Sequence, residues 1–127
     1  MTNAEFLNNN FGTNYKKWFK CSWKYNKDIL VWMVNFNKTT NCGWQNVIVD
    51  SNTIYESFVC DLNEQLDSHK YVFENYRLAV DKSQNYKILG LYKYDFENSN
   101  LHTKRIWHKV AESINEFISK QKHFNLL

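Results

Sequence analysis

Proline is absent from this sequence of 127 residues, and glycine occurs only at Gly12, Gly43 and Gly90. The turns must therefore be made mainly by asparagine, aspartate and serine, whose short polar side chains stabilise turns. Three widely separated glycines also exclude a glycine-rich phosphate-binding loop, which needs several glycines close together. An enzyme of that motif class is therefore disfavoured.

Cysteines are few as well. Cys21, Cys42 and Cys60 are an odd number and contain no C-x-x-C pair. This spacing favours reduced, buried thiols in a cytoplasmic protein over a disulfide framework or a zinc site. No apolar run approaches the roughly 18 residues that span a bilayer, and the N-terminus lacks the charged-then-apolar order of a signal peptide. No membrane partner is predicted.

Motifs for catalysis are missing too. The four histidines stand singly, without an H-x-x-x-H or H-E-x-x-H pair, and no carboxylate lies two residues before a lysine as in many nuclease metal sites. Asp50 and Glu56 flank a turn and could face each other as an acid/base pair, but acids beside turns are more often solvated. We predict no catalytic residue, no metal and no cofactor. The question of enzymatic activity stays open, with a non-catalytic protein favoured.

Large apolar side chains, in contrast, are abundant. Hydrophobic residues make up 43% of the sequence and aromatic residues 17%, which excludes a disordered chain. The length is that of one domain with one core. We predict a single α+β domain over residues 1–127. Its sheet should be strongly bent, antiparallel or mixed, or a small barrel, with about six strands, an N-terminal helical segment and a C-terminal amphipathic helix.

Periodicity places the elements of this domain. Apolar residues alternate on both faces of the stretch 28–37, which indicates a buried strand. This strand and the next two are expected to form an antiparallel meander with short polar turns. The predicted strands are 28–37, 44–50, 53–60 and 70–80, the predicted helices are 3–11 and 110–121, and 61–69 is a short helix or an ordered loop.

The stretch 86–110 has the pattern of a long β-hairpin, in which apolar and aromatic residues alternate with basic ones on both sides of a polar turn. Gly90 in its first strand indicates a bulge or a close backbone approach. On the returning strand, alternation separates Arg105, Trp107 and Lys109 from Lys104, Ile106 and His108.

Charge is distributed in blocks. Residues 1–49 carry six basic and two acidic groups, residues 50–81 carry two basic and seven acidic groups, and residues 82–127 carry eight basic and four acidic groups. If the two basic flanks meet in space, they favour an anionic partner. An ordinary mixed surface is the alternative at a net charge of only +3.

The segment 14–27 interleaves lysines with aromatic residues and contains no acid. Lysines that neutralise phosphates beside aromatic rings that stack on bases are typical of nucleic-acid surfaces. The alternative is an amphipathic element with aromatics in the core and lysines in water. The candidate nucleic-acid-binding residues of the whole chain are Lys16, Lys17, Lys20, Trp23, Lys24, Trp44, Lys93, Lys104, Arg105, Trp107 and His108.

Two short phrases carry a family resemblance. The strand phrase YKILGLY at 86–92 and the turn-strand phrase GWQN at 43–46 resemble the PUA-like modules, which include ASCH, EVE and SRA-type domains. The resemblance implies a small β-barrel that binds RNA or reads modified, flipped-out bases, often beside a restriction system. It assigns no acid of a base pocket in this sequence.

Two functions from different classes remain. The first is a non-catalytic nucleic-acid-binding module that accepts an unstacked or modified base in an aromatic pocket. The second is a small protein-binding or inhibitor protein of a mobile element, which would act through exposed aromatics and the acidic middle segment. The sequence does not indicate the oligomeric state.

Overall fold

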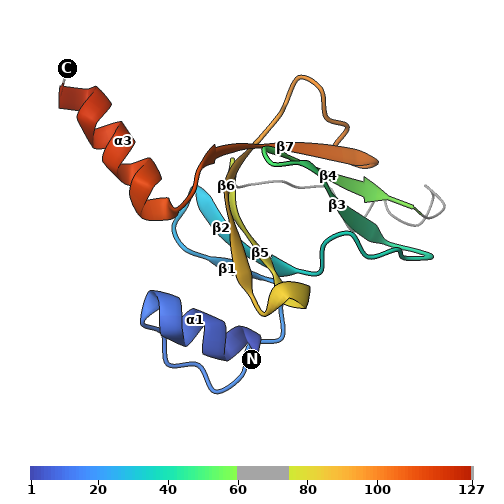
Figure 1. Ribbon diagram of the computed structural model, residues 1–127, viewed down its shortest axis with the longest axis horizontal. Helices are drawn as coiled ribbons and strands as arrows, with labels where there is room; N and C mark the ends of the chain where they lie inside the picture. Colours follow the sequence, from blue (N-terminus) through green and yellow to red (C-terminus); the bar gives the residue numbers. More distant parts are fainter. Residues whose placement is uncertain (60–74, 127) are drawn as a thin grey trace.

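The computed structural model describes residues 1–59 and 75–126, with side chains described as far as Lys122 (Figure 1). Seven strands form one mixed sheet in the order β1-β2-β5-β6-β7-β4-β3, in which β2 and β5 are parallel and the other neighbours antiparallel. The elements are α1 Asn3–Phe11, β1 Ser22–Lys24, β2 Ile29–Val34, β3 Trp44–Asp50, β4 Thr53–Phe58, β5 Tyr76–Asp81, the 3₁₀ turn η1 Lys82–Gln84, β6 Lys87–Tyr94, β7 Lys104–Ala111 and α3 Ile114–Leu126.

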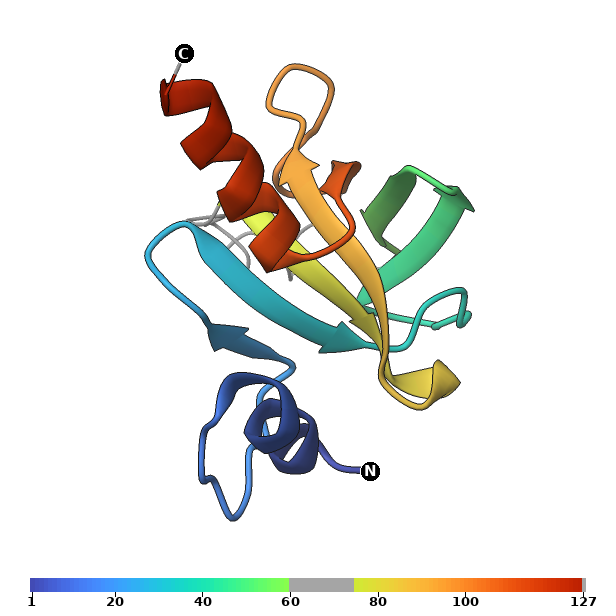
Figure 2. The same cartoon turned by 60° about the vertical axis from the view of Figure 1, so that its left-hand side comes forward.

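The predicted α+β fold with a strongly bent mixed sheet and a helix near each end is confirmed, although the sheet has seven strands and does not close. In Figure 1, β7 crosses above the upright strands β2, β5 and β6, and β4 and β3 continue the bend to the right. In Figure 2, α3 lies across the outer face of the sheet and α1, in dark blue, lies below β1 at the edge of the sheet.

The bend separates two cores. The helix-side core packs α1 and α3 on the outer face of the sheet, and the inner core fills the inside of the bend. As predicted for the buried strand, Val31 and Met33 enter the helix-side core, whereas Trp32 enters the inner core. The helix-side core contains Phe6, Leu7, Ile29, Val31, Met33, Leu78, Val80, Leu91, Ala111 and Ile114, and the inner core contains Trp32, Phe36, Ile54, Ala79, Tyr92, Tyr94 and Trp107.

The predicted meander is wrong. Of the three strands predicted for it, β3 and β4 do form a hairpin, but β2 pairs with β5 in parallel instead of with β3. The physical reason is burial: β2 and β5 are largely buried on both faces, so both occupy the covered middle of the sheet, where parallel pairs are usual. The more exposed β3 takes an edge.

The predicted boundaries are partly confirmed. The first helix begins at residue 3 as predicted, and Thr2 caps it, its hydroxyl accepting a hydrogen bond from the Glu5 N–H. Residues 110 and 111 extend β7 instead of opening the last helix, because Ala111 still pairs with Leu91. The predicted element at 61–69 and the first part of the predicted strand at 70–80 lie outside the described residues.

The expectation of reduced, buried thiols is wrong for two cysteines. Cys42, in the loop before β3, is disulfide-bonded, and Cys21 is a free but exposed thiol. Pairing depends on which loops the fold brings together, and spacing along the chain does not contain that information. Because Cys42 is disulfide-bonded, the cysteines no longer support the expectation of a reducing, cytoplasmic environment.

Gly90 confirms the predicted bulge and close approach. The register shifts beside it in both of its strand pairs, and its φ is +142°. A Cβ at this position would lie 2.5 Å from Lys109 Cε and 3.0 Å from the Ala111 carbonyl oxygen. Only glycine fits where β6 crosses under the Lys109 side chain.

Replacing Gly90 by alanine should therefore lower the free energy of unfolding by about 2–3 kcal/mol, because backbone strain and the clash add. Urea denaturation followed by tryptophan fluorescence measures this. Gly12→Ala is the matched control, because Gly12 also has a positive φ, +69°, but open space around it. An equal loss in the two variants would contradict the close approach.

Candidate functional site

A row of polar side chains crosses the inner face of the sheet. Strand register places Arg105 of β7 beside Glu56 of β4, and Glu56 beside Asn46 of β3. All three are buried, as is Arg77 of β5. One carboxylate oxygen of Glu56, Oε1, lies 3.2 Å from Arg77 Nη1, 3.5 Å from Arg105 Nη1 and 3.3 Å from the indole nitrogen of Trp107. Glu56 thus joins three strands of the bend.

Tryptophan rings enclose this ion cluster. The guanidinium carbon of Arg77 lies 4.4 Å from the ring centroid of Trp107 and 4.9 Å from that of Trp32. That of Arg105 lies 4.1 Å from the ring of Trp44. Cation–π contacts of this kind are strongest where water is excluded. The arginines are therefore held by both charge and aromatic faces.

Burial lowers the pKa of Arg105, Glu56 opposes that shift, and the neighbouring Arg77 adds to it. Guanidinium nevertheless stays protonated in proteins. Charged clusters inside a domain are commonly less stable than apolar packing of the same volume. A charged cluster at this place is therefore a candidate functional feature.

Among the described residues, Asn46 Oδ1 and Arg77 Nε are buried polar atoms of the inner face that make no hydrogen bond. Buried polar atoms are rarely left unpaired, and exceptions often mark ligand positions. Asn46 also lines a groove of about 330 Å³, so its side chain lies at the wall of a space that a ligand can enter. The groove is lined by Cys21, Met33, Val34, Asn35, Lys38, Thr39, Thr40, Trp44, Asn46 and Lys82.

Asp81, at the end of β5, holds one side of this groove in place. Its carboxylate accepts hydrogen bonds from the side chains of Ser83 and Gln84 and from the Phe36 N–H. Burial would raise the pKa of Asp81, but these hydrogen bonds outweigh it and keep the pKa below its usual value. The carboxylate therefore ties η1, which carries Lys82, to the loop after β2.

The predicted site residues of the hairpin fall on two faces. Arg105 and Trp107 point inward, and Trp44 lies beside them on β3. His108, Lys93 and Lys104 are exposed on the outer face. There His108 Nε2 lies 2.8 Å from Asp95 Oδ2, and Lys104 Nζ lies 4.0 Å from the ring centroid of Tyr55. Hydrogen bonds from Asn98 and His108 lower the pKa of Asp95 to about 2.

The lysine-aromatic segment lies elsewhere again, at the β1 edge beside α1. Strands β2 and β5 separate β1 from the hairpin, so the segment does not adjoin the hairpin's outer face. Trp23 is a packing residue: its ring lies 5.1 Å from that of Phe11, and its indole N–H donates to the Tyr15 hydroxyl. The segment's lysines, Lys16, Lys17, Lys20 and Lys24, are all exposed.

Sequence reasoning missed Asn46, Glu56 and Arg77 as site residues. A usable signal existed, because Glu56 stands at an inward position of its strand, between Ile54 and Phe58, where alternation calls for an apolar residue. The acid/base pairing with Asp50 does not occur. Glu56 pairs across the hairpin with Asn46, and Asp50 is exposed at the turn.

The comparisons with known proteins agree with this architecture. The family model of the SET and RING associated domain, SRA, matches residues 1–115. The chain belongs to the SRA family. The resemblance to PUA-like modules is thereby confirmed for its SRA-type branch.

Among solved structures, this SRA domain is similar to the 5-hydroxymethylcytosine-specific restriction enzyme AbaSI, with a TM-score of 0.63 and 23% sequence identity. At that sequence identity, the similarity shows that the two proteins share a fold and nothing further. It covers 85% of this chain and 37% of the enzyme, so the chain spans little more than a third of that protein's length. No curated protein matches the chain.

The described residues contain neither a membrane-spanning helix nor a cluster of metal ligands. Residues 1–59 and 75–126 contain no helix long and apolar enough to cross a membrane. The same part of the chain has no group of three or more histidine, cysteine, aspartate or glutamate residues placed to hold a metal ion. The acidic segment on which the protein-binding hypothesis depends lies largely within residues 60–74, outside the described ranges.

Proposed function

We propose that this SRA domain is a nucleic-acid-binding module that takes an unstacked base into the groove at Trp44 and Asn46. The observation that carries the proposal is the unpaired, buried Oδ1 of Asn46, a residue that lines a groove open to solvent. A ligand with a hydrogen-bond donor on a flat ring would satisfy that oxygen. The exocyclic amino group of cytosine or adenine is such a donor.

The size and walls of the groove support the same ligand. A volume of about 330 Å³ lies within the usual range for small-molecule sites, and Trp44 supplies an aromatic wall. The lysines Lys38 and Lys82 line the groove and supply positive charge for the phosphates on either side of an extruded nucleotide. Glu56 and the two arginines lie behind the groove and hold its walls in register.

The family and the structural neighbour support a modified base as the ligand. AbaSI is specific for 5-hydroxymethylcytosine by its name, so modified cytosine is the first base to test. Extrusion of a base costs unstacking energy, which a fitted pocket must repay. We further propose that the domain works beside a nuclease, as the restriction-enzyme neighbour suggests.

Asn46→Ala should reduce the affinity for oligonucleotides carrying 5-hydroxymethylcytosine by about 10-fold, because one good base contact contributes roughly 1–3 kcal/mol. Its stability should hardly change, since Oδ1 has no partner to lose. The measurement is fluorescence anisotropy with single- and double-stranded oligonucleotides, with and without the modification, across a salt series.

Asn115→Ala is the control, because Asn115 is exposed at the start of α3 and is no part of the groove. Failure of the unaltered protein to bind any oligonucleotide at low salt would reject the proposed function. Binding by Asn46→Ala as tight as by the control would reject the proposed groove.

A further inference from the structure

Strand β3 lies at an edge of the sheet, so the backbone groups on its outer side have no neighbouring strand to pair with. Two of these groups are nevertheless paired, and both pair with Asn37 in the loop between β2 and β3. The Asn37 N–H donates to the carbonyl oxygen of Asn46 at 2.7 Å, and the Ile48 N–H donates to the side-chain oxygen of Asn37, Oδ1, at 2.8 Å. Asn37 therefore takes the place of one residue of a neighbouring strand.

Asparagine suits this position because of its backbone. Asn37 is left-handed, with a φ of +59°, and asparagine adopts that conformation more readily than most residues with a side chain. Phe36, directly before it, is buried in the inner core, with its ring 5.2 Å from that of Trp32. Two hydrogen bonds and a buried neighbour thus define where this loop lies against the edge of the sheet.

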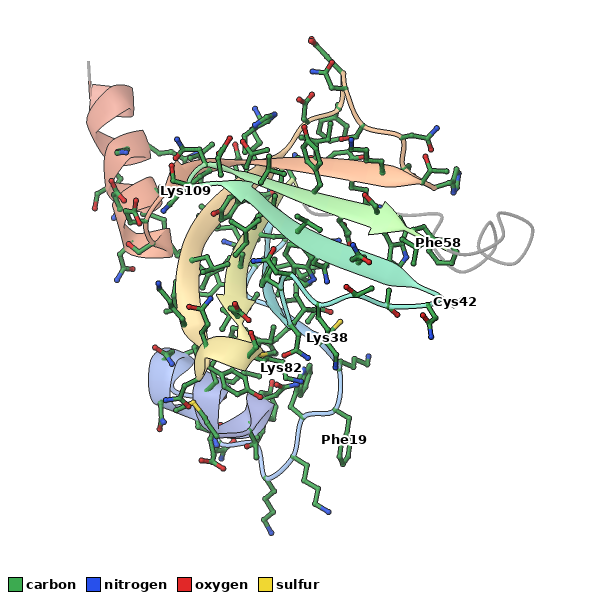
Figure 3. All side chains as sticks on the ribbon, turned by 45° about the vertical axis from the view of Figure 1, so that its right-hand side comes forward. Phe19, Lys38, Cys42, Phe58, Lys82 and Lys109 are labelled. Carbon is green, nitrogen blue, oxygen red and sulfur yellow. The ribbon has the colours of Figure 1, made fainter. Side chains whose placement is uncertain are left out.

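The loop that Asn37 fastens is one wall of the candidate groove. Residues 38–40 follow Asn37 directly, and all three line the groove. The other end of the loop is held at Cys42, which is disulfide-bonded. In Figure 3, Lys38 and Cys42 mark the two ends of this stretch, and Lys38 lies toward Lys82, which lines the same groove. Asn37 is therefore the anchor next to a lysine that the proposed function assigns to a phosphate.

The same contact holds Asn46 in place. The carbonyl oxygen of Asn46 is bonded to Asn37, whereas its side chain lies at the wall of the groove and has an unpaired Oδ1. The separation between this side chain and Lys38 therefore depends on Asn37, which is bonded to Asn46 and directly precedes Lys38. Selective recognition requires binding groups to be held within about 0.5 Å of their productive positions.

We infer that Asn37 is the positioning residue of the groove and sets its selectivity for the extruded base. The inference rests on the proposed function. Asn37 is not among the described residues that line the groove, so it acts through Asn46 and Lys38 without touching the ligand. Its hydrogen bond with the Ile48 N–H lies at the surface, where water can replace it. Loss of Oδ1 should therefore cost little stability but let the loop move relative to β3.

The test measures affinity by fluorescence anisotropy for two duplexes that differ in one 5-hydroxymethylcytosine. Asn37→Gly keeps the left-handed backbone and its N–H but removes Oδ1. It should weaken binding to the modified duplex about fivefold, the lower end of the loss for one base contact. Binding to the unmodified duplex should change less than about twofold, because phosphate contacts dominate it. The ratio of the two affinities should therefore fall.

Two further variants serve as controls. Asn37→Asp keeps an acceptor at the position of Oδ1, so its ratio of affinities should stay within about twofold of that of the unaltered protein. Its added negative charge acts on both duplexes alike. Asn85→Gly is the matched control, because Asn85 is also left-handed, with a φ of +55°, and exposed, but is not among the described residues that line the groove. Asn85→Gly should leave both affinities unchanged.

Amide hydrogen exchange in the free protein supplies a readout that does not depend on nucleic acid. In Asn37→Gly the Ile48 N–H should exchange about fivefold faster, because it loses one surface hydrogen bond. The Val47 N–H, which faces β4, should exchange at the same rate as before. A melting temperature within about 4 °C of that of the unaltered protein separates positioning from loss of folding.

An unchanged ratio of affinities in Asn37→Gly, whether both affinities stay or both fall, overturns the inference and leaves the proposed function standing. Equal affinity of the unaltered protein for the two duplexes also overturns the inference, because the groove then has no selectivity for Asn37 to set. If the unaltered protein binds neither duplex, the proposed function and the inference are both rejected.

Discussion

Glu56→Ala should lower the free energy of unfolding by about 3–5 kcal/mol, which is a large part of the stability of a domain this size. Its carboxylate lies between Arg77 and Arg105 and accepts the indole N–H of Trp107. Without it Arg77 loses its ion pair while buried, and the two guanidinium groups repel each other where water is scarce. Urea denaturation at neutral pH measures the loss.

Two variants make this prediction specific. Glu97→Ala removes an exposed acid of the β6–β7 loop and should change stability by no more than about 0.5 kcal/mol. Glu56→Leu combined with Arg77→Met removes both partners of one ion pair. This double variant should lose less free energy of unfolding than Glu56→Ala, because it does not leave Arg77 buried without the Glu56 carboxylate. If Glu56→Ala unfolds at the same urea concentration as Glu97→Ala, the buried cluster is not what holds the bend.

Trp107→Ala should have an effect of similar size, about 3–5 kcal/mol, and should lower the melting temperature by about 10 °C. Trp107 is completely buried at the centre of the inner core. Its ring lies 5.1 Å from that of Tyr94 and 6.1 Å from that of Trp32, so its removal opens a cavity behind the groove. Thermal unfolding followed by circular dichroism measures the change.

Trp107→Phe distinguishes the contribution of the aromatic ring from that of the indole N–H. It keeps an aromatic side chain but loses the indole N–H that Glu56 accepts, so a loss of about 1–2 kcal/mol is expected. The exposed Phe96→Ala provides the baseline for removing an aromatic ring from the surface. A melting temperature of Trp107→Ala within a few degrees of that of Phe96→Ala would contradict the prediction, because it would show that the inner core rearranges to fill the cavity.

Local features of the fold were predictable because their signals are local. Alternation along β2 correctly separates Val31 from Trp32, and the bounds of β3 were predicted to the residue. Gly90 marked a close approach because a strand seldom tolerates glycine without one. Pairing between distant strands leaves no such mark. The parallel pairing of β2 with β5 depends on how the buried strands are arranged in the whole sheet, and this arrangement is not encoded in either strand alone. The meander that was predicted in its place was wrong.

The candidate site shows the same division. Trp44, Arg105 and Trp107 were named from their residue types, and the structure places them together on the inner face. His108 and Arg105 were both candidates, and the predicted alternation of this strand correctly places them on opposite faces, so His108 lies away from the buried group. Glu56 was passed over because acids near turns are usually solvated, and only the register of three strands reveals its partners.

The parallel pairing of β2 with β5 has a consequence for the order of folding. The Phe36 N–H and the Asp81 carboxylate that accepts it are 45 residues apart, so this part of the sheet forms only after a long loop has closed. The β3–β4 hairpin, in contrast, closes through a turn of two residues and can form early. Arg77 on β5 reaches Glu56 on β4 only when both events are complete. The groove therefore depends on contacts between residues far apart in the sequence, and a ligand that binds there selects molecules in which those contacts have formed.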